Sequence, residues 1–182
     1  VMSLHEIIEK FELSKVHKKS AVFDEKKLNW ISGQHLAMQS NNTIISDIKL
    51  INDTWGNSES HEYCLNVIDL IKSRSKSLVE LMEQSNYYFN DPNEFDEKSV
   101  RKIWKDGTKD IVESVRLILE TIDNWENKFL EEKLKSFMEE RELGFGKVMK
   151  PVRLAICGTV NGPSLFAIMD LVGKDVCLRR IN

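Results

Sequence analysis

The sequence has few of the residues that build tight turns or covalent cross-links. Its 182 residues include 8 Gly, 3 Pro and 3 Cys. The low glycine and proline content disfavours β-sandwiches, barrels and glycine-rich phosphate loops, which need many tight turns or close backbone approaches. The cysteines, Cys64, Cys157 and Cys177, are odd in number and far apart. This spacing excludes a disulfide scaffold and a zinc motif, and it favours a reducing compartment.

Long apolar runs and the common catalytic motifs are also missing. No segment approaches the roughly 20 apolar residues of a membrane helix, and no basic start precedes an apolar core as in a signal peptide. The sequence contains no G-x-x-x-x-G-K, G-x-G-x-x-G, H-E-x-x-H or G-x-S-x-G motif. The four histidines, at positions 5, 17, 35 and 61, have no companion cysteines nearby. We therefore expect neither a catalytic site nor a metal site in this chain.

Charge is nearly balanced overall but uneven along the chain. The formal net charge is -3, which argues against a surface that is uniformly basic and built for nucleic acid. The segment from Lys147 to the C-terminus, however, contains six basic and two acidic residues, which gives it a net charge of +4. This asymmetry is a hint of an anionic partner for the last segment, and chance clustering on a solvated face explains it equally well.

Apolar residues recur at helical spacing from end to end, which predicts an all-α fold. Ser3 with Glu6 forms a capping box, and Asp24, Thr43 and Asn124 are the expected N-caps of later helices. The predicted apolar stripes run through residues 4–11, 28–35, 44–51, 64–82, 100–104, 111–122 and 129–138. Gly144 and Gly146 are expected to end the last of these helices.

The best internal boundary is the turn-forming segment Asn90-Asp91-Pro92-Asn93, which follows the aromatic residues 87–89. It predicts two consecutive helical subdomains with short loops. After it, residues 148–156 read as a short helix with Pro151 near its first turn, where a missing N–H is tolerated. The loop 157–164 then leads into a helix that ends at Gly173, and a short tail carries Arg179 and Arg180.

The loop 157–164 and its neighbours are the most suggestive chemical feature. Arg153 lies one helical turn before it, and Gly158 and Gly162 allow close backbone approach to a ligand. Pro163, Leu165 and Phe166 add rigid or apolar surface on which an unstacked base could lie. These are the parts of a single-stranded RNA site, although spacing alone favours a packing corner between two helices.

Two blocks of sequence resemble a known family. Residues 22–35 read VFDEKKLNWISGQH, and residues 150–159 read KPVRLAICGT, followed by GPSLF at 162–166 and LRR at 178–180. Together they are similar to the block after the lysine-loop signature and to the C-terminal end of bacterial-type glutamyl-tRNA synthetases. The resemblance implies the all-helical anticodon-binding part of such an enzyme. The catalytic signatures of that family are absent here.

The resemblance also implies a division of the chain and a partner. Residues 1–40 would end the stem-contact region, 41–86 would form the first anticodon-binding subdomain and 87–182 the second. The implied partners are tRNA(Glu) and the enzyme's own N-terminal catalytic domain, which would hold ATP and Mg; no cofactor is implied for this fragment. A cytoplasmic monomer that does not contact a membrane is expected.

Individual site residues follow from the same resemblance. Arg74 falls where discriminating members carry an arginine that reads the third anticodon base, with Lys72 as the alternative position. Paired hydrogen bonds from a guanidinium to one base edge are worth about 1–3 kcal/mol of discrimination. Arg153, Pro163 and Leu165 match positions that contact or stack on the anticodon in the family, and Lys135 replaces an arginine on the adjacent helix. Gly162 stands at a commonly polar position, where only its backbone could bond, and Phe166 completes the candidate binding residues.

A second function class stays open at this point. The leading hypothesis is an RNA-binding module, and the second is an all-helical protein-interaction or scaffold domain that binds no RNA. A free-standing enzyme is the least favoured interpretation, because no catalytic constellation is found.

Overall fold

The structure, a computed structural model, describes residues 1–17, 19–20 and 22–182. Within these residues it contains helices and no strand, which confirms the predicted all-α class. The α-helices are α1 (Leu4–Lys10), α2 (Glu25–Met38), α3 (Asn41–Ile51), α4 (His61–Ile71), α5 (Leu78–Phe89), α6 (Glu97–Ile103), α7 (Thr108–Glu120), α8 (Asn127–Glu140), α9 (Phe145–Cys157), α10 (Leu165–Val172) and α11 (Lys174–Ile181). Two 3₁₀ turns, η1 (Leu13–Lys15) and η2 (Lys72–Arg74), complete the list.

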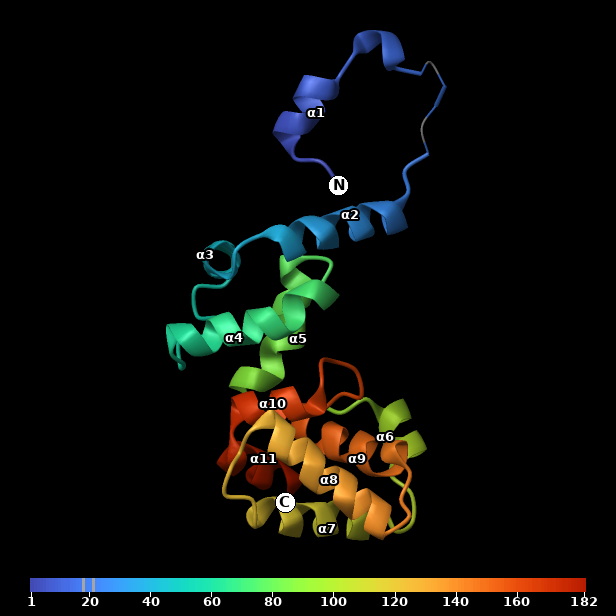
Figure 1. Cartoon of the computed structure of the whole chain (residues 1–182). Helices are drawn as coiled ribbons and strands as arrows, with labels where there is room; N and C mark the ends of the chain where they lie inside the picture. Colours follow the sequence, from blue (N-terminus) through green and yellow to red (C-terminus); the bar gives the residue numbers. More distant parts are fainter. Residues whose placement is uncertain (18, 21) are drawn as a thin grey trace.

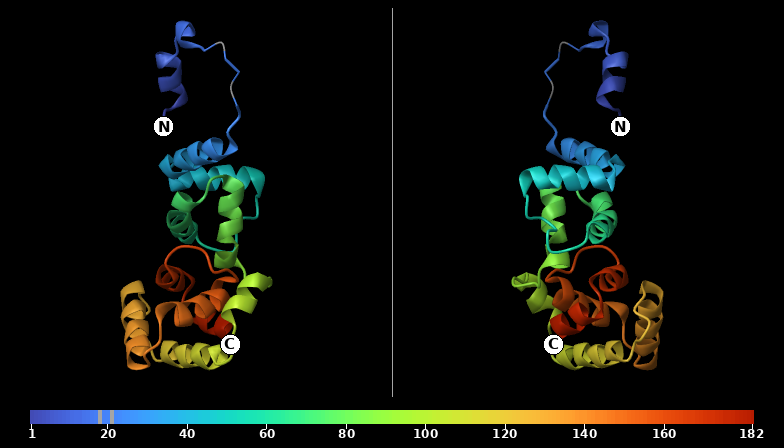
Figure 2. Two further views of the ribbon diagram at one scale, coloured as in Figure 1. Left: turned by 90° about the vertical axis from the view of Figure 1, so that its right-hand side faces the viewer. Right: turned by 90° about the vertical axis from the view of Figure 1, so that its left-hand side faces the viewer.

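The helices form an elongated molecule (Figure 1). The segment with α1 lies at one end, α2 to α5 form a middle layer and α6 to α11 form the other end, as the turned views of Figure 2 also show. The linker 90–96 joins the last two groups, where the sequence predicts its main boundary. The buried apolar side chains nevertheless form one continuous cluster from Leu36 to Ile181, and α4 packs against α10.

Several predicted helix starts are confirmed. The Ser3 hydroxyl accepts a hydrogen bond from the backbone N–H of Glu6, whose carboxylate accepts one from the N–H of Ser3. Asp24 accepts a hydrogen bond from the N–H of Lys27 at 3.0 Å and caps α2. These local signals work because each side chain satisfies backbone donors that a helix start leaves free.

Other predicted boundaries are wrong. Ser40, not Thr43, caps α3, because its hydroxyl accepts from the N–H of Thr43 and so places that residue inside the first turn. The stripe 64–82 is two helices, not one: Ser75 donates to the carbonyl of Ile71, and Ser77 caps α5. Side-chain bonds of this kind compete with a continuous helix.

The C-terminal part differs most from the prediction. α8 begins at Asn127, not after Asn124, and the N–H of Asn127 donates to a carboxylate oxygen of Asp170. Gly144 starts α9 instead of ending α8, so Pro151 lies inside α9, not in its first turn. The tail with Arg179 and Arg180 is the helix α11.

The N-terminal end packs least. α1 has no buried residue, and Leu4, Ile8 and Phe11 are all exposed. On α2 only Leu36 is buried, and Trp30 is 58% exposed. These two helices therefore present apolar side chains that the described chain leaves uncovered. No described helix is both long and apolar enough to cross a bilayer.

Candidate functional site

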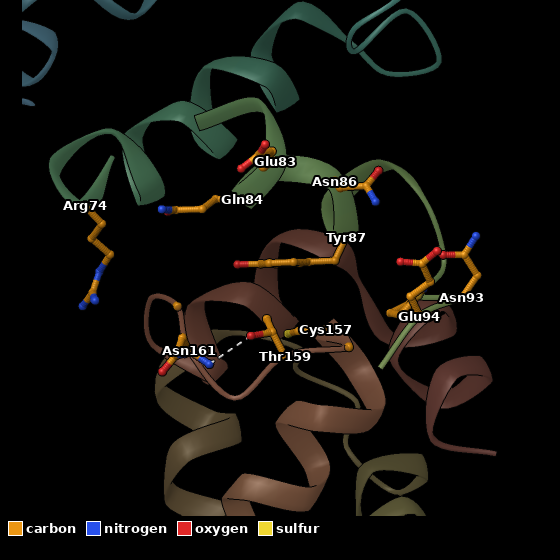
Figure 3. Close-up of a pocket in the computed structure, with 13 residues that line it drawn as sticks. Arg74, Glu83, Gln84, Asn86, Tyr87, Asn93, Glu94, Cys157, Thr159 and Asn161 are labelled. Carbon is orange, nitrogen blue, oxygen red and sulfur yellow. Dashed lines mark hydrogen bonds between the residues drawn. The ribbon is translucent and has the colours of Figure 1, made fainter. Parts of the chain in front are cut away.

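A cavity of about 550 Å³ opens between the middle helices and the C-terminal group. Its upper wall comes from Arg74 in η2 and from one face of α5, its lower wall from the loop after α9, and the linker closes one side (Figure 3). The lining residues are Arg74, Glu83, Gln84, Asn86, Tyr87, Pro92, Asn93, Glu94, Cys157, Gly158, Thr159, Asn161 and Gly162. We call this cavity the inter-subdomain pocket. Its size is ordinary for a small-ligand or single-base site.

The pocket is polar, with charges of both signs. Arg74 is exposed and lies on the same side of the pocket as Asn161, while Glu83 and Glu94 supply carboxylates (Figure 3). One guanidinium and two carboxylates would repel a bare anion such as phosphate more than they would attract it. The same groups offer donors and acceptors to a neutral ligand edge.

The ring of Tyr87 lies between the two walls, under Gln84 and above Thr159 (Figure 3). Burial raises the pKa of Tyr87 to about 12, against smaller opposing effects, first from the hydrogen bond with Tyr88 and then from the charge of Arg153. Its hydroxyl therefore stays protonated at neutral pH, and it lies 3.5 Å from the hydroxyl of Tyr88. Burial also raises the pKa of the Cys157 thiol to about 12, so this sulfur is no nucleophile at neutral pH.

Backbone conformation brings the linker and the loop after α9 together. Gly158 has φ +70°, and a Cβ there would lie 2.9 Å from Cβ of Pro92 and 3.0 Å from the carbonyl oxygen of Glu94. The absence of a side chain at Gly158 therefore lets the linker close the pocket. Thr159 accepts a hydrogen bond from the N–H of Asn161 at 3.3 Å, which fixes the tip of the loop.

Arg153 holds the far end of this loop. Its Nη2 donates to the carbonyl oxygen of Pro163 at 2.6 Å, and its Nη1 is buried with no hydrogen-bond partner among the described residues. A Cβ on Gly162 would lie 3.1 Å from that Nη1 and 3.3 Å from the Tyr87 hydroxyl oxygen. The predicted pair Arg153 and Gly162 is thus in contact at the edge of the pocket.

The apolar platform that the sequence suggests is wrong in this conformation. Pro163 is buried, and Leu165 and Phe166 are only 4% and 5% exposed. Leu165 and Phe166 belong to the hydrophobic core because α10 packs against α4 and α8. A base could reach these side chains only after the loop moved, so they do not form an exposed stacking surface.

The two predicted lysines lie outside the pocket. Lys72 donates to the side-chain oxygen of Asn41 at 2.8 Å and so holds α3 against η2. Lys135 on α8 pairs with Glu131 at 2.7 Å and borders a separate surface hollow beside Phe145. The structure therefore places Arg74 and Gly162 in the lining of one pocket and Arg153 next to Gly162 outside that lining, and it leaves Lys72 and Lys135 apart from the pocket.

Several basic residues of the C-terminal segment bond to other groups of the protein. Arg179 and Arg180 both bond to Asp91, and Lys174 donates to the carbonyl oxygens of Glu120 and Ile122. These bonds leave less of the +4 charge of the last segment available to an anionic partner than the sequence hints. The sequence reasoning also missed the polar pocket residues Gln84, Thr159 and Asn161, for which the sequence holds no motif.

No group of three His, Cys, Asp or Glu residues that could hold a metal occurs among residues 1–17, 19–20 and 22–182. The three cysteines are all free and buried.

Comparison with known proteins identifies the family. A family model described as an anticodon binding domain matches residues 34–182. The chain belongs to this anticodon-binding family. This membership favours an RNA-binding module over a protein-interaction scaffold without RNA binding.

Relatives of this anticodon-binding domain span the whole chain. The glutamate–tRNA ligase of Chloroherpeton thalassium is 36% identical over 192 residues, which cover 100% of this chain and 38% of that protein. The glutamate–tRNA ligase of Christiangramia forsetii is 33% identical, with 98% of this chain and 35% of that protein covered. The crystal structure of a glutamate tRNA ligase from Elizabethkingia meningosepticum, in complex with its amino acid, superposes with a TM-score of 0.84 at 31% identity. That match covers 100% of this chain and 36% of the other, so the domain spans little more than a third of these relatives.

Proposed function

We propose that this domain reads the anticodon of tRNA(Glu) for a glutamate–tRNA ligase. The carrying observation is the inter-subdomain pocket, in which Arg74 from one wall and the loop 157–162 from the other line one polar cavity. A flipped anticodon base is a neutral polar ligand, and it matches a lining of one guanidinium, two carboxylates and four side-chain amides. Binding energy spent here would orient the distant acceptor end of the tRNA.

Arg74 is the proposed reader of the third anticodon base, which separates glutamate from glutamine codons. It is exposed, and its guanidinium can offer paired donors to one base edge. Glu83, one turn before Tyr87 on α5, provides a carboxylate acceptor in the same pocket. Arg153 and Gly162 are proposed to shape the loop that a neighbouring nucleotide meets. The buried Nη1 of Arg153 would be the donor available to that nucleotide.

The remaining proposed sites have smaller roles. Two lysines would contact RNA outside the pocket. One is Lys72, and the other is Lys135, which lies beside the hollow lined by Phe145. Pro163, Leu165 and Phe166 would support the loop from the core side.

The chain is proposed to act within a longer protein. Residues 1–40 would be the end of a stem-contact region. Residues 41–86 would form the first anticodon-binding subdomain, and residues 87–182 would form the second. The proposed division after residue 86 lies close to the linker 90–96, which follows the end of α5 at Phe89. The exposed apolar faces of α1 and α2 would contact the catalytic half, which would hold ATP and Mg. We propose that the whole enzyme is a cytoplasmic monomer.

The test is a titration of this chain with anticodon stem–loop RNAs. Two RNAs would differ only at the third anticodon base, one with the base of tRNA(Glu) and the other with that of tRNA(Gln). We expect tighter binding of the first RNA, and an affinity that falls steeply between about 50 and 200 mM salt, because phosphate contacts release counterions. Equal affinity for the two RNAs, or no binding at low salt, would contradict the proposal.

A further inference from the structure

Arg180 makes an unusual set of hydrogen bonds behind the inter-subdomain pocket. Its Nε donates to Asp91 at 2.8 Å, and its Nη2 donates to the carbonyl oxygen of Asn90 at 2.9 Å. Its Nη1 donates to the carbonyl oxygens of Tyr87 at 2.8 Å and of Ile156 at 3.0 Å. The side chain is only 4% exposed. One buried guanidinium therefore bonds to residues from α5, from the linker and from α9.

The carbonyls that Nη1 meets belong to the two walls of the pocket. Tyr87 lines the pocket itself, and Ile156 directly precedes the lining residue Cys157. Both lie in the last turn of their helices, where carbonyls have no donor within the helix. A cation is also favoured at such helix ends, because the peptide dipoles leave partial negative charge there. Arg180 satisfies one carbonyl from each wall through a single nitrogen.

We propose that Arg180 is a positioning residue that fixes the spacing between the two walls of the inter-subdomain pocket, and thereby its choice of base. The proposal builds on the proposed RNA-reading function. Asp91 orients the guanidinium from the linker side through its bond to Nε. No other described residue is hydrogen-bonded to α5, the linker and α9 at once.

The shape of the side chain is essential to this role. A guanidinium presents five donors in a fixed plane, whereas a lysine ammonium presents three donors around one atom. Arg180→Lys would keep the charge and could keep one or two of the bonds. It could not span Tyr87, Ile156, Asn90 and Asp91 together. The lysine variant therefore separates charge from geometry.

Arg179 provides a matched control. It is the neighbouring residue on α11, it bonds to the same Asp91 at 2.8 and 2.9 Å, and its side chain is 59% exposed. Among the described residues, its hydrogen bonds reach no carbonyl of either wall. Arg179→Met removes a surface ion pair, which typically contributes little.

The first experiment measures wall spacing without RNA. Spin labels are attached at Glu62→Cys on α4, which packs against α5, and at Lys147→Cys on α9. Both positions are exposed, whereas the three native thiols are buried and should escape labelling. The parent protein and Arg179→Met should give the same narrow distance distribution. Arg180→Met and Arg180→Lys should give a broadened or displaced one.

The second experiment measures base choice in the full chain without labels. The ratio of affinities for the two stem–loop RNAs should fall about tenfold in Arg180→Lys, which corresponds to a change of about 1.4 kcal/mol. In Arg179→Met it should stay within about twofold of the parent. Circular dichroism and thermal unfolding establish that each variant is folded, and if Arg180→Met does not fold, Arg180→Lys carries the test.

The two experiments separate this proposal from the one on which it builds. If the parent protein shows no RNA preference, the proposed function fails, and the distance distributions still test the role of Arg180. If a folded Arg180→Lys keeps both the parent distance distribution and the parent affinity ratio, the positioning role is overturned. A lower melting temperature alone would not support it.

Discussion

Nη2 of Arg153 donates a 2.6 Å hydrogen bond to the carbonyl oxygen of Pro163, ten residues further along the chain. This bond connects α9 to Pro163, the residue before the N-cap Ser164 of α10. Nη1 of the same guanidinium is buried without a partner among the described residues. A buried donor left without an acceptor costs about 1–3 kcal/mol, so an acceptor on a bound ligand would be gained at this position.

We predict that Arg153→Met lowers affinity for the cognate stem–loop RNA about tenfold, because both the bond to Pro163 and the free donor are lost. The unfolding free energy should change less than the binding free energy, because the substitution also removes the buried Nη1 donor that has no partner among the described residues of the unsubstituted protein. A fluorescence titration and a urea unfolding curve measure the two quantities. The control is Arg101→Gln on α6; Arg101 is exposed and forms an ion pair with Glu97. Unchanged affinity in Arg153→Met would remove this residue from the site.

Gly162→Ala should lower the melting temperature of the protein more than Gly107→Ala does. Both glycines have positive φ, +141° and +78°, so an added Cβ is strained at either position, at a cost of about 1–3 kcal/mol. Only at Gly162 would the new Cβ also meet side chains, namely Nη1 of Arg153 and the hydroxyl of Tyr87. Thermal unfolding compares the two variants, and RNA binding should weaken only in Gly162→Ala. Equal effects of both substitutions would show that the contact is unimportant.

Arg74→Gln should reduce discrimination at the third anticodon base. The exposed guanidinium is replaced by a shorter neutral amide, so about 1–3 kcal/mol of preference between the two RNAs should be lost. Stability should hardly change, because no hydrogen bond from Arg74 to another described residue is found. The measurement is the affinity ratio for the two stem–loops, with Arg101→Gln as the charge-matched control. A preserved ratio in Arg74→Gln would transfer the reading role to another lining residue.

The sequence predicts those features that depend on neighbouring residues. The capping box of Ser3 and Glu6 and the cap at Asp24 are confirmed because each bond spans three residues. The linker after Phe89 is confirmed for the same reason, since Asn, Asp and Pro break a helix locally.

Features set by distant contacts could not be predicted. The start of α8 depends on Asp170, which lies 43 residues away from Asn127. Arg180 has the appearance of a free basic residue in the sequence, and only the fold brings Asp91 and three backbone carbonyls to it. The pocket could not be predicted for the same reason, because its two walls come from distant parts of the chain that only packing brings together.

Trp55→Phe should lower the unfolding free energy by about 1–3 kcal/mol, because the indole N–H that satisfies a buried hydroxyl is lost. Nε1 of Trp55 donates to Oγ of Ser85 at 2.9 Å, and the ring packs edge-on against Phe89 with centroids 5.0 Å apart. Trp30→Phe changes the same residue type at a site that is 58% exposed and should have little effect. Urea unfolding measures both variants. A comparable loss in Trp30→Phe would contradict the assignment of the effect to the buried bond.

The Asp91 carboxylate should make stability depend on pH in a defined window. Hydrogen bonds from Arg179 and Arg180 lower the pKa of Asp91 to about 2 in the folded protein, below the value of about 4 for an unfolded aspartate. The unfolded chain therefore binds the proton first as the pH falls. The stabilisation is complete above about pH 4 and is lost progressively as the pH falls towards 2. Asp91→Asn lacks this carboxylate, so its melting temperature should lie below that of the parent at pH 7 and approach it between about pH 4 and 2.5. A difference between the two proteins that stays constant over this range would show that the ion pairs of Asp91 do not contribute to stability.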